Sequence, residues 1–174
     1  VFIAGQKVGP TGRVIGVDAT LEMVKRAARN AKKAGCRNVT FKHAPIERLP
    51  LKDDSIDVAI SNCVMNHCPD KVKAFGEVHR VLNPGGRIFI SDLVTAGQFS
   101  DKALKDELWG EWLASALPKD EYLDSIVRAG FQEVAVVREA AFAMAEKEDM
   151  LRGKIVSILV TARKRQTDTA DSSC

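Results

Sequence analysis

The sequence predicts an α/β fold built on a mostly parallel sheet, and three observations support this prediction. Short apolar runs alternate with amphipathic helical segments along the chain, as in consecutive β-α units. Several of these runs end directly on an acidic or amide side chain. The final apolar runs depart from strict alternation, so we expect the last strand to be antiparallel to its neighbours.

The individual elements follow from these apolar runs and from the residues between them. Thr20 is placed to cap the first complete helix, and Gly35 ends that helix. Asp70 is placed to cap a second helix, which the Asn-Pro-Gly-Gly turn at residues 83–86 ends. One or two further helices, broken at a proline, are expected between residues 101 and 130. Strands are expected at residues 13–18, 38–43, 56–61, 87–92, 131–137 and 154–162.

Composition limits the classes of function that the chain can have. With 174 residues it is long enough for one domain with its own core. Its 26 basic and 23 acidic residues leave a net charge of +3, which is too balanced to indicate a nucleic-acid binder. No apolar run reaches the roughly 18 residues of a membrane span, and no secretory signal pattern is present. We therefore expect a cytoplasmic protein that binds neither nucleic acid nor membrane, folded over residues 1–162 with a disordered polar tail at 163–174.

The segment from Ile56 to Asp70 is the first candidate for a site. An apolar strand runs into a loop with two cysteines, two asparagines and a histidine, and ligands of parallel sheets bind where strands end. Cys63, at the strand end, fits either a soft-metal ligand or a small buried side chain. The spacing from Cys63 to Cys68 matches no usual zinc pair, which favours a structural role for Cys68. His67 is interpreted as structural more readily than as catalytic.

Asp18 ends the first expected strand and is a candidate for ribose binding. A carboxylate in this position can accept two hydrogen bonds from the vicinal hydroxyl groups of a ribose. The alternative is that Asp18 only caps the loop before the helix.

No glycine-rich phosphate-binding loop is present in the sequence. Residues 1–12 look like the back half of a helix followed by a turn, and such a helix normally follows a strand. We therefore expect a first strand and its glycine-rich loop to be missing from this sequence. Without them, neighbouring strands would have open edges through which the chain tends to associate.

Five sequence pieces occur in a recognisable order: VIGVD, IERLP before DDSIDV, SNCVMNHCPDK, VLNPGGR and ISD. This order resembles the class I S-adenosylmethionine-dependent methyltransferases, which have a Rossmann-like sheet. The SNCVMNHCPDK piece and LWGEWLASAL, at residues 108–117, are more particular to the arsenite methyltransferase family. The resemblance covers residues 1–162. It implies S-adenosylmethionine as the cofactor and methyl transfer to trivalent arsenic held by cysteine thiolates.

The resemblance also implies roles for individual residues by position. Asp18 matches the acid that holds the ribose hydroxyls of the cofactor. Cys63 matches one of the cysteines that bind trivalent arsenic, and Cys68 is a tentative second ligand. The other expected cofactor contacts are Met23, Ile46 and Glu47 near the adenine, and Ser61 and Asn62 near the methionine part.

Two residues depart from the pattern of the family. Pro45 stands where the family usually has an acid near the adenine amino group, and Trp112 stands where an arsenic-binding cysteine would follow Trp-Gly-Glu. Two alternatives therefore stay open beside the arsenite hypothesis, namely a class I methyltransferase with a small organic acceptor and a catalytically incomplete fragment. In the arsenite hypothesis the partners are the small-molecule substrate and a thiol reductant.

Overall fold

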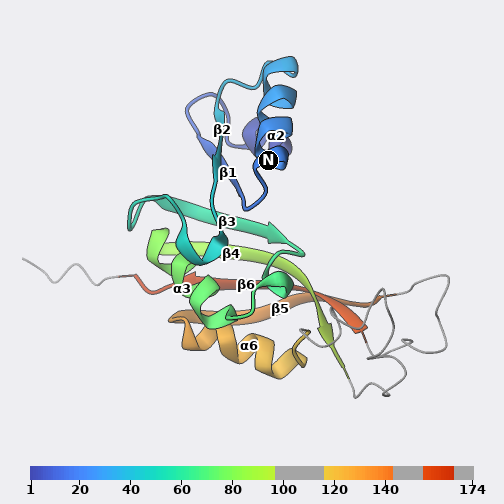
Figure 1. Cartoon of the computed structure of the whole chain (residues 1–174). Helices are drawn as coiled ribbons and strands as arrows, with labels where there is room; N and C mark the ends of the chain where they lie inside the picture. The colour runs from blue at the N-terminus through green and yellow to red at the C-terminus, as the bar shows by residue number, and fades with distance from the viewer. Residues whose placement is uncertain (97–115, 143–154, 167–174) are drawn as a thin grey trace, which may run out of the picture. The chain divides into compact units, whose positions relative to one another are not determined.

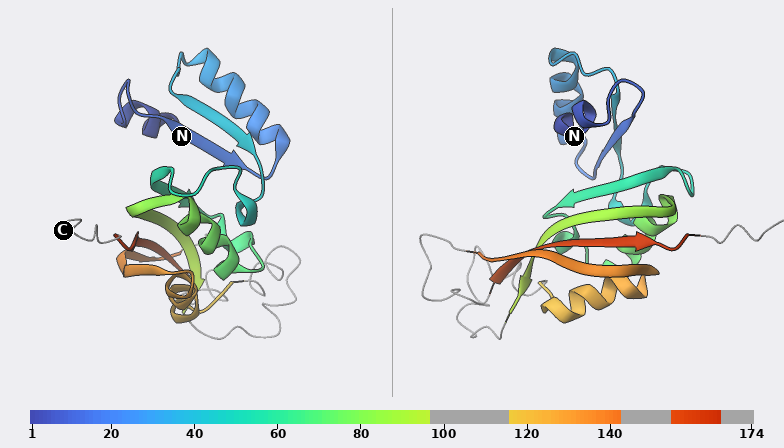
Figure 2. Two further views of the ribbon diagram at one scale, coloured as in Figure 1. Left: turned by 90° about the vertical axis from the view of Figure 1, so that its left-hand side faces the viewer. Right: turned by 180° about the vertical axis from the view of Figure 1, so that it is seen from behind.

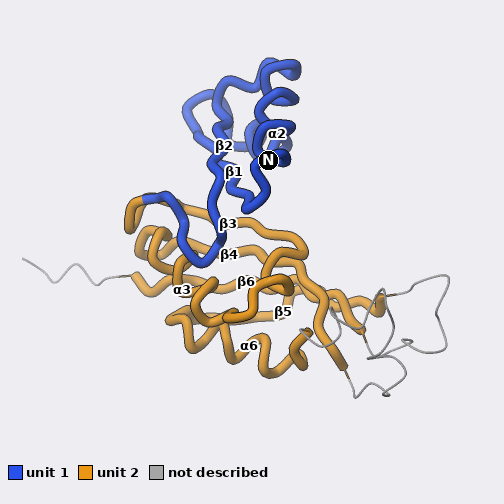
Figure 3. The backbone as a smooth tube through the Cα atoms, in the orientation of Figure 1, with its two compact units in different colours: residues 1–51 blue, residues 52–174 orange. Residues whose placement is uncertain are grey.

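The computed structural model describes residues 1–96, 116–142 and 155–166. The chain divides into two compact units, residues 1–51 and residues 52–174 (Figure 3). Each unit is described by itself below. The expected helix around Trp109 and Trp112, as well as Cys174, lies outside the described residues. In the part of the chain that is described, no helix combines the length and the apolar character that crossing a membrane requires.

The first unit is a small β-α-β arrangement with a short helix before it (Figure 1). The two strands pair in parallel, with Val14 opposite Val39 and Asp18 opposite His43. The side-chain amide of Asn38 donates to the carbonyl oxygens of Gly5 and Gly9 at 2.8 and 2.9 Å, which ties the first helix to the start of the second strand. The elements of this unit are α1 (Phe2–Lys7), β1 (Val14–Asp18), α2 (Leu21–Lys33), β2 (Val39–His43) and the 3-10 turn η1 (Ile46–Arg48).

The second unit is a four-stranded sheet with the strand order β3-β4-β6-β5 in the described residues. β3 and β4 are parallel, whereas β6 runs antiparallel to both β4 and β5. The predicted α/β fold with an antiparallel last strand is therefore confirmed. The elements are β3 (Ile56–Asn62), the 3-10 turn η2 (Met65–His67), α3 (Lys71–Val81), β4 (Leu82–Thr95), α6 (Lys119–Arg128), β5 (Phe131–Ala141) and β6 (Ile155–Lys164).

The core of the second unit lies between one face of this sheet and the helices α3 and α6, which cover that face together (Figure 2). Alternate residues of β4 and β6 point toward the helices, and the rings of Phe75 and Tyr122 meet edge-on there at 5.7 Å between centroids. The fully or almost fully buried aliphatic side chains of this layer are Ile88, Ile90, Val94, Ile126, Ile158 and Val160.

Two helix boundaries confirm the capping residues expected for them. The Asp70 carboxylate accepts the backbone N–H of Lys73 at 2.9 Å and so caps α3. Gly35 has a φ of 66° just after α2, a conformation that residues with a Cβ rarely adopt. Thr20 occupies the N-cap position of α2, but its side chain makes no capping hydrogen bond.

Two strand boundaries differ from the expected ones. The expected turn at residues 83–86 belongs to β4, which follows α3 without a break and bulges between the pairs Ile56–Leu82 and Val58–Arg87. The structure absorbs the turn because both flanking residues of β4 pair with β3. β6 continues to Lys164, so the first residues of the expected tail extend the last strand.

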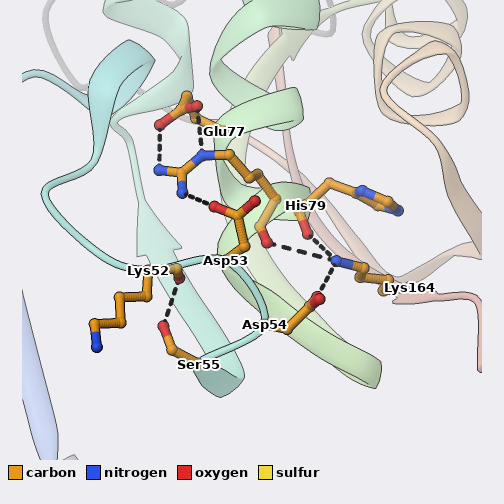
Figure 4. Close-up of polar contacts among 8 residues, drawn as sticks. Lys52, Asp53, Asp54, Ser55, Glu77, His79 and Lys164 are labelled. Atoms are coloured by element: carbon orange, nitrogen blue, oxygen red, sulfur yellow. Dashed lines mark hydrogen bonds and ion pairs between the residues drawn. The ribbon is translucent and has the colours of Figure 1, made fainter.

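A cluster of charged side chains holds the end of α3 beside the loop before β3 (Figure 4). The ammonium group of Lys164 donates to the Asp54 carboxylate at 2.6 Å and to the His79 carbonyl at 3.0 Å. The guanidinium of Arg80 bridges the carboxylates of Glu77 and Asp53. The cluster has a structural role, since its hydrogen bonds satisfy charged groups and a carbonyl at the helix C-terminus.

Candidate functional site

The candidate site in the second unit begins where β3 ends. Cys63 follows the strand directly, with a φ of 54°, a left-handed conformation that is uncommon outside glycine and often occurs at functional positions. Its backbone N–H donates to the Ser91 carbonyl at 2.8 Å, so the backbone at Cys63 stays attached to β4. Cys63 is exposed, whereas burial around its thiol and the negative charge of Asp92 raise the pKa of that thiol.

Asp92, on β4, is the most perturbed acid of the candidate site. Its side chain is fully buried, and its Oδ2 accepts a hydrogen bond from the Tyr122 hydroxyl at 2.8 Å. Burial raises the pKa of Asp92 to about 6, against the opposing effects of the Tyr122 hydroxyl and the positive charges of Lys71 and His67. The same burial, together with Asp92, raises the pKa of Tyr122, which therefore stays a hydrogen-bond donor. A buried acid with a shifted pKa at a strand end is typical of functional sites.

Lys71 and Cys68 lie beside this acid at the start of α3. Lys71 is buried, and its ammonium group donates to the Cys68 carbonyl at 3.1 Å. Burial lowers the pKa of Lys71, while charges on Cys68 and Asp92 raise it. The Cys68 thiol is also buried and lies 3.7 Å from the Val64 carbonyl. Cys68 is thus packed as part of the core beneath the loop.

The loop between β3 and α3 contains a buried amide that sequence reasoning left without a role. Asn66 is 2% exposed, and neither its amide nitrogen nor its oxygen has a hydrogen-bond partner among the described residues. The hydroxyl of Ser61, near the end of β3, is likewise buried without a partner there. His67, between these residues and Cys68, is exposed. Polar atoms left unpaired in the interior suggest that a bound molecule completes their hydrogen bonds.

The candidate site in the first unit lies at the carboxyl end of β1. One oxygen of the Asp18 carboxylate accepts the backbone N–H of Thr20 at 2.8 Å. This bond matches the alternative that Asp18 caps the loop before α2. It also leaves a second carboxylate oxygen for a ligand, so the two interpretations are compatible.

The residues expected near the adenine lie at the same end of this unit. The backbone N–H of Ala44 donates to the Asp18 carbonyl at 3.1 Å, which places the start of η1 beside the end of β1. Ile46 and Glu47 belong to η1 and are half-buried, with the exposed Pro45 at its N-cap. Met23, in the first turn of α2, is 48% exposed.

The predicted site residues therefore fall into two groups. Asp18, Met23, Ile46 and Glu47 belong to the first unit, whereas Ser61, Asn62, Cys63 and Cys68 belong to the second. Within the described residues, no set of three or more histidine, cysteine or acidic side chains gathers as a metal centre.

Sequence reasoning gave no role to the pair of Asp92 and Tyr122. Asp92 ends the expected strand at residues 87–92, and the argument that selected Asp18 applies to it equally. Tyr122 had no signal in the sequence, because α6 brings it to Asp92 from 30 residues away.

Comparison with known proteins identifies the family. A family model described as a methyltransferase domain matches residues 1–156. The chain belongs to this methyltransferase family. The expected resemblance to class I methyltransferases is confirmed.

Individual relatives agree with the resemblance to the arsenite enzymes. The chain is 39% identical to an arsenite methyltransferase of Halobacterium salinarum over 173 residues, which cover 96% of the chain and 44% of that relative. It is 27% identical to a demethylmenaquinone methyltransferase of Lactococcus lactis, covering 83% of the chain and 66% of that relative. The chain thus spans less than half the length of the arsenite methyltransferase of Halobacterium that it matches.

A solved structure shows the same fold. The crystal structure of an arsenic (III) S-adenosylmethionine methyltransferase from Chlamydomonas reinhardtii superposes with a TM-score of 0.78 at 30% identity. The match covers 97% of this chain and 60% of that one. The Rossmann-like class I fold expected from the sequence is thereby confirmed.

Proposed function

We propose that the protein containing this chain transfers a methyl group from S-adenosylmethionine to trivalent arsenic held by cysteine thiolates. The observation that carries this proposal is Cys63, exposed and in a left-handed conformation at the carboxyl end of β3. The similarity to arsenite methyltransferases over almost the whole chain supports it. A thiol reductant as partner and a cytoplasmic location belong to the same proposal.

The residues present fit the cofactor in the parts that they would contact. The Asp18 carboxylate keeps one oxygen beyond its bond to Thr20, and a ribose diol offers the hydroxyl donors that this oxygen accepts. The Ser61 hydroxyl, buried without a partner among the described residues, offers a polar contact near the methionine part. The cofactor supplies the methyl group on a positively charged sulfur. The remaining work of the chain is to bind and orient the two reactants.

The substrate chemistry explains why a cysteine is needed. Trivalent arsenic is soft, and soft thiolate ligands hold it better than carboxylates or amides do. Its lone pair can attack the methyl group without prior removal of a proton, so no strong general base is required. Cys63 would hold the arsenic, and Cys68 remains a tentative second ligand because its thiol is buried in the described structure.

A methyl-transfer assay tests the proposal. Full-length protein is incubated with radiolabelled S-adenosylmethionine, arsenite and an excess of a small thiol, and labelled methylarsenicals are separated and counted. The proposal expects product that depends on both arsenite and enzyme. Turnover with an organic acceptor but none with arsenite would reject it.

The second candidate function is methyl transfer to a small organic acceptor. The similarity to a demethylmenaquinone methyltransferase favours it, as does an indole at position 112 in place of a cysteine. An aromatic side chain suits the wall of an organic pocket better than it suits an arsenic site. A quinone precursor offered in parallel with arsenite in the same assay separates the two functions.

A further inference from the structure

Buried polar atoms without hydrogen-bond partners gather at one place in the second unit. In the described part of the chain, all such side-chain atoms belong to Ser61, Asn66 and Asp92. Ser61 stands opposite Ile90 in the parallel register, and Asp92 lies two residues beyond Ile90 on the same face of the sheet. Buried polar groups are normally paired, and leaving one unpaired costs stability. Their concentration at the carboxyl ends of β3 and β4 indicates a site that a ligand completes.

Asp92 is the best positioned of these groups to receive a ligand. Tyr122 fixes one carboxylate oxygen by its 2.8 Å hydrogen bond, so the other oxygen, Oδ1, is held in place without a partner among the described residues. The ring of Tyr122 is itself fixed edge-on against Phe75. Oδ1 is thus a preorganised hydrogen-bond acceptor.

Asn66 lies on the turn that packs against Asp92. η2 contacts β4, and the charge of His67, the next residue along this turn, acts on the Asp92 carboxyl. The Asn66 amide offers one acceptor and two donor hydrogens, none of them used by the described residues. The neighbouring thiol of Cys63 is close enough for the charge of Asp92 to act on it.

We propose that Asp92 and Asn66 form a hydrogen-bonding subsite for hydroxyl groups of the methyl acceptor while Cys63 holds its arsenic. The inference rests on the proposed function. Arsenous acid is neutral at pH 7 and carries three hydroxyl groups, each of which can donate a hydrogen bond. When Cys63 binds it, an arsenic–sulfur bond forms and an arsenic–oxygen bond breaks. The thiol proton leaves with the released hydroxyl as water. The two remaining hydroxyls then donate to Asp92 Oδ1 and the Asn66 carbonyl oxygen.

The subsite distinguishes hydroxylated acceptors from other thiophilic species, and a pair of probes tests this. Full-length protein is titrated with arsenous acid or with methylmercury, which binds one thiol and carries no hydroxyl group in that complex. Protection of Cys63 from alkylation, read by peptide mass spectrometry, gives both affinities. With Asp92→Asn we expect about tenfold weaker binding of arsenous acid and unchanged binding of methylmercury.

Matched variants keep this test decisive. Asp57→Asn removes an exposed carboxylate of β3 that pairs with Asn83, and it should alter neither affinity. Asn66→Ala removes a buried amide without disturbing a described hydrogen bond, so it tests the subsite even where Asp92→Asn folds poorly. It should also weaken arsenous acid selectively.

The possible outcomes separate this inference from the function on which it rests. Unchanged arsenous acid binding in both subsite variants overturns the subsite, and so does an equal loss of both probes. If the unsubstituted protein protects Cys63 with methylmercury but not with arsenous acid, the proposed function fails and the subsite fails with it.

Discussion

At the scale of single residues, the carboxylate of Asp18 has two tasks that different substitutions separate. Asp18→Asn keeps an oxygen for the Thr20 N–H, whose bond measures 2.8 Å, but removes the charge that strengthens hydrogen bonds from ribose hydroxyls. We expect roughly tenfold or greater loss of affinity for S-adenosylhomocysteine in calorimetric titration of the full-length protein. Glu22→Gln, an exposed change in the next helix, serves as the control. Equal affinities for Asp18→Asn and the control would leave Asp18 with the capping role alone.

Asp92 also predicts a specific dependence of stability on pH. Its pKa rises from 3.8 to about 6 on folding, so the folded state binds the additional proton between these values. Stability from this group therefore falls as pH rises through that window, and the full cost of about 3 kcal/mol remains above it.

Asp92→Asn should remove this cost. In urea unfolding we expect the variant to gain stability relative to the unsubstituted protein at pH 7.5 and to gain much less at pH 4.5. Asp57→Asn, an exposed change, should show no such difference between the two pH values. The same shift at both pH values for Asp92→Asn would contradict the assignment of the cost to ionisation.

At the scale of elements, Lys164 connects the last strand to the end of α3. Lys164→Met removes its ion pair with Asp54 and the hydrogen bond to the His79 carbonyl while keeping most of the apolar stem. We expect a loss of about 1–2 kcal/mol in the free energy of unfolding, because the side chain is only 16% exposed.

The matched change is Lys119→Met, which removes the exposed pair with Glu139. Surface pairs of this kind contribute about 0.5 kcal/mol or less. Chemical denaturation of both variants measures the difference. Similar losses in the two would show that the C-terminal contacts of Lys164 contribute nothing beyond a surface ion pair.

Elements could be predicted from sequence where their signals are local. The Asp70 cap and the Gly35 stop depend on residues within one helical turn, and both are confirmed. The start of β4 could not be predicted, because residues 82–86 look like a turn and become part of a strand only by pairing with β3. The same holds for the site, where Cys63 follows from a strand end but the contact of Asp92 with Tyr122 depends on α6 packing across the sheet.

At the scale of the whole molecule, β3 is the strand most exposed to association. In the described residues it pairs on one side only, with β4, and its Ile60 is 69% exposed. Such an edge can pair with another chain. Ile60→Lys should reduce the concentration-dependent self-association of this 174-residue chain in sedimentation experiments.

Val127→Lys is the matched change for this prediction. Val127 is 54% exposed on α6 and presents no unpaired strand edge, so the same new charge should have a smaller effect there. If both variants reduce association equally, net charge rather than the β3 edge controls it.

The central claim is that Cys63 holds the arsenic that is methylated, and a comparison of two thiols tests it most directly. Cys63→Ser and Cys36→Ser are made in the full-length protein, since Cys36 is a half-buried thiol of the first unit with no proposed role. Methyl transfer from labelled S-adenosylmethionine to arsenite is then measured for both. We predict a loss of about a hundredfold or more for Cys63→Ser, with activity retained by Cys36→Ser. Arsenite methylation that survives Cys63→Ser at the unsubstituted rate would contradict the account.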